Sequence, residues 1–133
     1  MAIDRRSEIT SNLQVVRDEI SKAVMGAGRS LDEITLIAVT KTFPASDVEI
    51  LRDLGVTDFG ENRDADAAPK AADVAGTWHF QGQIQSNKLK SITSWAHVIH
   101  SLDEIRHFEV IEKSAPHPLE IFCQVSLDGS EGR

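Results

Sequence analysis

The chain has 133 residues, and 14 Lys+Arg against 21 Asp+Glu give a formal net charge of −7. With 41% hydrophobic and 26% charged residues, the composition is typical of a soluble globular domain. An acidic chain without a basic run is a poor candidate for nucleic-acid binding, and no apolar stretch approaches the roughly 18 residues of a membrane span. The single cysteine, Cys123, allows no internal disulfide, so we expect a cytoplasmic protein in which this thiol is buried and inert.

The first predicted element is a helix that ends near Gly26 and Gly28, because glycine just past a periodic apolar run is a common helix stop. Its apolar residues recur at spacings of three and four and form one stripe: Ile9, Leu13, Val16, Ile20 and Val24.

Strands and helices then alternate along the chain. Residues 35–40 form a nearly continuous apolar run, which favours a strand buried on both faces of a parallel sheet. Further strands are predicted at 56–59, 77–81, 97–100 and 119–126, with helices at about 46–54, 62–74, 86–93 and 102–113. We expect Ser46 and Ser86 to cap two of these helices and Pro69 to break or kink another. The alternation predicts parallel strands, either in an open doubly wound sheet or in part of a (β/α) barrel.

In both of these folds, functional groups gather at the carboxyl ends of the strands. Lys41 directly follows the first strand, so we expect its side chain to be partly desolvated. Desolvation makes a lysine amine easier to deprotonate and therefore able to attack a carbonyl group. The alternative interpretation is a structural ion pair, for example with Glu61.

The histidines and glycines do not predict a metal site or a phosphate-binding loop. His97 and His100 are three residues apart on a strand and therefore face opposite sides, while His107 and His117 are expected at the surface. His79 is expected to be hydrogen-bonded in the core or to line a site. No glycine-rich phosphate-binding motif has the required spacing, and no Cys/His metal spacing occurs.

Three motifs carry a resemblance to a known family: AVTKT at residues 38–42, FGEN at 59–62 and WHFQGQIQSNK at 78–88. In this order and at these spacings, they resemble the pyridoxal phosphate homeostasis proteins (YggS/PROSC type). The fold of that family is similar to the N-terminal domain of alanine racemase. The resemblance extends from the first helix to the end of the chain.

The resemblance implies an α/β fold, a (β/α) TIM-type barrel, of which this chain is the front portion with about five parallel strands, crossover helices and an N-terminal helix. It implies pyridoxal 5′-phosphate held as a Schiff base on Lys41, with Asn62 lining the pocket and His79 near the same end of the barrel. The implied function is intracellular pyridoxal phosphate homeostasis without turnover, with pyridoxal phosphate-dependent enzymes as partners. The family's phosphate-binding motifs do not occur here, so residues 1–133 are expected to be one incomplete barrel domain.

Two other functions remain open from the sequence. A pyridoxal phosphate enzyme of the alanine-racemase type would need a second acid/base group, usually a tyrosine, and the chain contains no tyrosine. The remaining alternative is a truncated chain that does not hold the cofactor, since its phosphate site is missing and two edges of its sheet would be unpaired.

Overall fold

The alternation of strands and helices predicted from the sequence is present in the computed structural model, which describes residues 4–129. The elements in chain order are α1 (Arg5–Gly26), the 3-10 turn η1 (Leu31–Glu33), β1 (Ile37–Val39), α2 (Ala45–Asp53), β2 (Asp58–Glu61), α3 (Asp64–Asp73), β3 (Thr77–Phe80), the 3-10 turn η2 (Ser86–Lys88), α4 (Leu89–Trp95), β4 (Val98–Leu102), α5 (Ile105–Ser114) and β5 (Glu120–Cys123).

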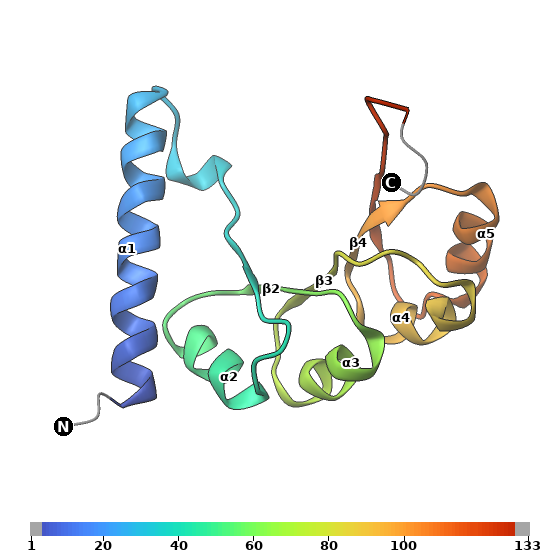
Figure 1. The fold of residues 1–133 in the computed structure, drawn as a ribbon, viewed down its shortest axis with the longest axis horizontal. Coiled ribbons are helices and arrows are strands. Elements are labelled where there is room, and N and C mark those ends of the chain that lie inside the picture. Colours follow the sequence, from blue (N-terminus) through green and yellow to red (C-terminus); the bar gives the residue numbers. More distant parts are fainter. Residues whose placement is uncertain (1–3, 130–133) are drawn as a thin grey trace.

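The five strands form one parallel sheet in the order β1-β2-β3-β4-β5, so each strand pairs with the next one along the chain. A doubly wound sheet instead reverses its strand order at a switch point. Because crossovers of one hand between successive neighbours keep the helices on the same side, helices α2 to α5 follow one another along the outside of the sheet (Figure 1). The predicted α/β fold class is therefore confirmed. Of the two folds considered, the strand order excludes the open doubly wound sheet and favours part of a (β/α) barrel.

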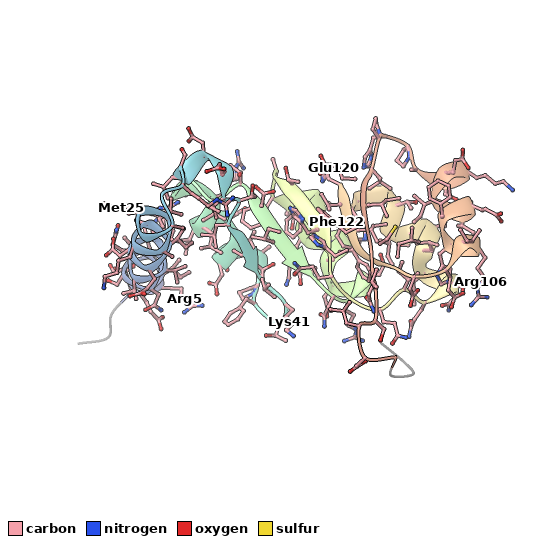
Figure 2. The ribbon with its side chains drawn as sticks, turned by 90° about the horizontal axis from the view of Figure 1, so that it is seen from above. Arg5, Met25, Lys41, Arg106, Glu120 and Phe122 are labelled. Carbon is pink, nitrogen blue, oxygen red and sulfur yellow. The ribbon has the colours of Figure 1, made fainter. Side chains whose placement is uncertain are left out.

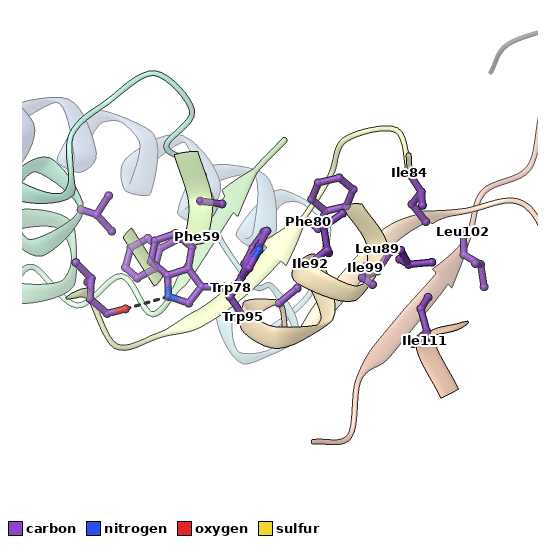
Figure 3. Packing of buried hydrophobic residues seen from close by; sticks show 14 of the residues in the cluster. Phe59, Trp78, Phe80, Ile84, Leu89, Ile92, Trp95, Ile99, Leu102 and Ile111 are labelled. Carbon is purple, nitrogen blue, oxygen red and sulfur yellow. Dashed lines mark hydrogen bonds between the residues drawn. The ribbon is translucent and has the colours of Figure 1, made fainter. Parts of the chain in front are cut away.

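The sheet has an outer face covered by helices and an inner face that no helix of the described residues covers (Figure 1). On the outer face, Phe59 and Trp78 belong to one buried cluster with Leu89 and Ile92 of α4 (Figure 3). The indole N–H of Trp78 donates to the carbonyl oxygen of Val74 at 3.0 Å. The inner face consists of the strand residues that alternate with the outer ones: Ile37, Val39, Asp58, Gly60, Thr77, His79, Val98, His100, Glu120 and Phe122.

Helix α1 lies beside α2 and is joined to it by polar contacts (Figure 1). Arg5 pairs with the largely buried Asp47 at 2.6 Å, and the Arg17 guanidinium donates to the carbonyl oxygen of Leu54 at 2.9 Å. The helix ends at Gly26 as predicted. Val16 is exposed although it lies on the predicted apolar stripe, so the stripe is only partly buried.

The predicted cap of α2 is wrong, because the N-cap lies two residues earlier than Ser46. Pro44 occupies the N-cap position, and Ser46 lies inside the first turn. Proline is tolerated here because the first N–H groups of a helix have no intrahelical partner. A capping box does occur at η1, where the side chain of Ser30 accepts a backbone hydrogen bond and Glu33 accepts one from the backbone of Ser30.

Pro69 lies inside α3 and does not divide it, so the expected break is absent. Three further expectations fail locally. Ser86 does not cap a helix, because it lies inside η2 and its hydroxyl is hydrogen-bonded to His107. The first strand is not buried on both faces, since Val39 is 53% exposed on the uncovered inner face. Cys123 is exposed rather than buried, because β5 is the edge strand of the sheet in the described residues.

Candidate functional site

Polar residues meet where the parallel strands end. Lys41 follows β1, Asn62 follows β2 and Gln81 follows β3. The registers of these strands, in which Ile37 pairs with Asp58 and Asp58 with Thr77, place the three residues at one level across the sheet. We call these three residues the rim. Functional groups of (β/α) barrels lie at this end of the strands.

Lys41, the rim residue that its position after the first strand singled out, is exposed. Figure 2 shows it at one edge of the molecule, beyond the end of its strand. Its ammonium forms neither an ion pair nor a hydrogen bond with any described residue, and the ion pair considered with Glu61 is not made. The expected desolvation is wrong, because no described element covers the inner side of the sheet at this point.

Glu61 instead pairs with Lys70 of α3, and both side chains are buried. The Lys70 ammonium lies 2.5 Å from Oε1 of Glu61 and donates to the carbonyl oxygen of Thr40 at 2.9 Å. Thr40 directly precedes Lys41, and Glu61 directly precedes Asn62. A single buried cation therefore fixes the ends of two neighbouring strands. Sequence reasoning missed Lys70; the available signal was a lone lysine among the alanines of a predicted helix.

Thr42, next to Lys41, has a left-handed backbone with φ 70°, and it is the one non-glycine residue in the described part of the chain with a positive φ. It lies in a tight turn in which the Phe43 N–H donates to the carbonyl oxygen of Thr40 at 3.1 Å. A β-branched residue is strained in this region, and such strain clusters at functional sites. The turn fixes how the chain leaves β1 at Lys41.

Asn62 lines a pocket of about 530 Å³ together with Gln83 and Lys88. The backbone of Gly82 approaches Asn62 so closely that a Cβ at this position would collide with the Asn62 carbonyl oxygen. The Ser101 hydroxyl donates to the carbonyl oxygen of Gly82. Glycine is therefore required at position 82, and the loop after β3 is held against Asn62.

His79 lies one level below the rim, on the inner face, and is almost fully buried. Its Nε2 is 2.8 Å from Oδ1 of Asp58, and its Nδ1 is 2.9 Å from Nε2 of His100. A carboxylate only accepts hydrogen bonds, so Nε2 of His79 donates to Asp58, and one proton lies between the two imidazoles. The prediction that His79 is hydrogen-bonded is confirmed. Its partners come from β2 and β4, and none of its hydrogen bonds reaches Lys41 or Asn62.

The chain of polar contacts on the inner face ends at an aromatic ring. Phe122 stacks on His100 with ring centroids 5.0 Å apart and an interplanar angle of 14°. Burial, followed by the proximity of His79, lowers the pKa of His100, and burial together with His117 lowers the pKa of His97. These two imidazoles are therefore neutral at pH 7. The link from Asp58 through His79 to His100 needed the strand registers, which the sequence did not provide.

Strand order and the position of the rim define the class: this chain is part of a (β/α)-barrel protein with its candidate site at the carboxyl ends of the strands. No protein-family model matches the chain. Curated relatives named pyridoxal phosphate homeostasis protein occur in Mycobacterium leprae (36% identical over 98% of this chain), Pseudomonas aeruginosa (35% over 96%) and Escherichia coli K12 (35% over 96%). The chain spans 58–59% of the length of these relatives.

Solved structures give the same result. PipY, the COG0325 family member of Synechococcus elongatus solved with PLP bound, has a TM-score of 0.72 and 28% identity, covering 90% of this chain and 55% of that one. An unknown protein from Bifidobacterium adolescentis has a TM-score of 0.83 and 27% identity, covering 99% of this chain and 61% of that one. The chain is a homologue of the pyridoxal phosphate homeostasis proteins, which confirms the resemblance of the three motifs. None of the described helices is long and apolar enough to span a membrane.

Proposed function

We propose that this chain binds pyridoxal 5′-phosphate through a Schiff base on Lys41 and acts in pyridoxal phosphate homeostasis without turnover chemistry. The observation that carries the proposal is the contrast between two lysines near the strand ends. The Lys70 ammonium is occupied by Glu61 and Thr40, whereas that of Lys41 has no partner among the described residues. An aldehyde condenses only with an amine that it can reach and that can lose its proton.

The rim fits the aldehyde end of this cofactor. Lys41 supplies an amino group that no described residue engages, and the Asn62 amide, one strand away at the same level, offers both a donor and an acceptor. The names of the curated relatives and the PLP-bound structure of PipY support the same cofactor. We further propose that His79 supports the site from one level below, by fixing the inner face between β2 and β4.

The proposal of a non-catalytic role rests on the groups that surround Lys41. The cofactor supplies an electrophilic aldehyde, but a racemase also needs a second acid/base group. The chain has no tyrosine, and both ring nitrogens of His79 are engaged by Asp58 and His100. We propose that cofactor-dependent enzymes are the partners, and that the protein acts in the cytoplasm, where a chain with one cysteine needs no disulfide.

Borohydride trapping tests the assignment of Lys41. The full chain is incubated with pyridoxal 5′-phosphate, reduced with borohydride and digested, and the adduct is located by mass spectrometry. We expect the adduct on Lys41 and its loss in Lys41→Arg, which keeps the positive charge. Lys88→Arg is the matched control, because Lys88 is exposed and lines the pocket beside Asn62.

The Schiff-base assignment and the non-catalytic role can each be overturned by a separate result. An adduct of unchanged yield in Lys41→Arg, or equal labelling of Lys88, would remove the Schiff-base assignment. Racemisation of L-alanine at enzymatic rates by the cofactor-loaded chain would remove the non-catalytic role and favour the racemase-type alternative.

A further inference from the structure

The loop between β4 and α5 gathers three side chains of the kinds that bind metal ions. Asp103 follows β4 directly, Glu104 is the N-cap of α5, and His107 lies in the first turn of that helix. One potential ligand atom from each residue lies within 4.8 Å of the other two. Both carboxylates are exposed, whereas His107 is only 4% exposed, which corrects the sequence-based expectation of a surface histidine.

His107 has one engaged and one unpartnered ring nitrogen. Its Nε2 is 2.8 Å from Oγ of Ser86 in η2, while its buried Nδ1 has no hydrogen-bond partner among the described residues. Buried polar atoms nearly always have a hydrogen-bond partner or bind an ion or water, so the unpartnered Nδ1 needs an explanation. Nδ1 is the ring nitrogen nearer the backbone, and the His107 N–H donates to the Glu104 carbonyl oxygen at 3.1 Å. The imidazole contributes one nitrogen to the cluster with the two carboxylates, and Nδ1 is the nitrogen that no described residue engages.

We propose that Asp103, Glu104 and His107 form a binding site for a divalent transition-metal ion of the Zn²⁺ type, with Nδ1 of His107 as the nitrogen ligand. One imidazole and two carboxylates are a donor set that such ions accept, and a water molecule completes a tetrahedral shell. Ser86 orients the imidazole: when Nε2–H donates to its hydroxyl, Nδ1 carries the lone pair that a metal ion needs.

Two positive charges near this loop disfavour the binding of a cation, but both leave the carboxylate and imidazole ligands available. The start of a helix carries a partial positive charge, and Arg106 pairs with Oε2 of Glu104. That ion pair engages Oε2 and leaves Oε1 of Glu104 free to bind an ion. Two carboxylates together outweigh the single guanidinium charge. The site is separate from Lys41 and does not depend on the proposed cofactor.

Calorimetric titration of the chelator-treated full chain with ZnCl₂ tests the proposal. We expect binding of one ion and a raised Tm at saturation. Asp103→Asn/Glu104→Gln changes only exposed side chains, so it should fold while weakening binding at least tenfold. The matched control is Glu109→Gln/Glu112→Gln, with the same change of charge on exposed positions of α5. Ser86→Ala should weaken binding roughly tenfold, since it removes the group that orients the imidazole.

The imidazole itself is followed by nitrogen NMR, which avoids substituting a buried histidine. Zn²⁺ should shift Nδ1 of His107 and leave the nitrogens of His79 and His100 unchanged. The proposal is overturned if no stoichiometric binding occurs, if both double variants lose affinity equally, or if another histidine carries the shift.

Discussion

The outer and inner faces of the same five strands are held in different ways. On the outer face, Phe59 and Trp78 are almost completely buried beneath helices, so apolar burial dominates. On the inner face, Asp58, His79 and His100 are joined by directional hydrogen bonds across three strands. The difference indicates that apolar burial stabilises the outer face, whereas polar contacts between side chains order the inner face.

The largest expected effect comes from removing an outer aromatic ring. Trp78→Ala should lower the free energy of unfolding by roughly 3–5 kcal/mol, because it leaves a cavity in the core and removes the donor to Val74. Phe122→Ala is the matched change on the inner face, where the ring is 55% exposed and only stacks on His100; we expect a loss of about 1 kcal/mol. Urea unfolding measures both. Equal losses would contradict the division between the faces.

Lys70 and Lys41 should differ in how much each contributes to the free energy of unfolding. Lys70→Met should cost about 3 kcal/mol, because Glu61 would remain buried without its partner. Lys41→Met changes an exposed, unpaired side chain and should stay within about 0.5 kcal/mol. Adding Glu61→Gln to Lys70→Met should restore part of the loss, since the buried charge is removed with its partner. Thermal and urea unfolding of the four proteins would show whether the buried pair acts as a unit.

Acidification should act mainly on the inner face. The pKa of His100 is lowered below its ordinary value of 6.5 by burial, so between these two pKa values the unfolded chain binds more protons than the folded one. The stabilising effect of the neutral imidazole is present above pH 6.5 and is lost as the pH falls towards the folded pKa. Since the ring is only partly buried, we expect a loss below about 1 kcal/mol. His100→Gln should flatten the dependence of stability on pH just below pH 6.5; an unchanged slope would exclude His100 as its source.

The smallest change in stability is expected in the turn after β1, where Thr42 has a left-handed backbone. Thr42→Gly should raise stability by about 0.5 kcal/mol, because relief of the left-handed strain exceeds the backbone entropy that glycine loses. Thr35→Gly is the control at an exposed loop position without positive φ, and it should destabilise the fold. If both changes destabilise equally, the turn after Lys41 is not strained.

The sequence predicted the order of the elements well, because apolar runs and helical stripes are local signals. It placed boundaries less well: the second strand was predicted at 56–59 and lies at Asp58–Glu61. The difference arises at Gly60 and Glu61, since a glycine and a charged residue do not look like part of a buried strand. Only the packing of Lys70 against Glu61 makes a carboxylate compatible with that position.

The candidate site was predicted in position but not in environment. Lys41 follows its strand as expected, because the carboxyl end of the first strand can be read from where its apolar run stops. Asn62 directly follows β2 only because that strand ends two residues later than predicted. Exposure of Lys41 and burial of His107 depend on which segments cover them, and that is a property of tertiary packing. The polar chain through His79 depends on register, which changes the partner of every residue when a strand shifts by a single position.

The sequential strand order also has a consequence for how the sheet forms. Each strand pairs with a segment roughly twenty residues further along the chain, so no pairing requires closure of a long loop. The entropic cost of closing each of these loops is therefore similar and modest, and during synthesis the N-terminal segments are available first. Strands β1 and β2 can therefore pair, with α2 packed against them, while β5 is still being translated.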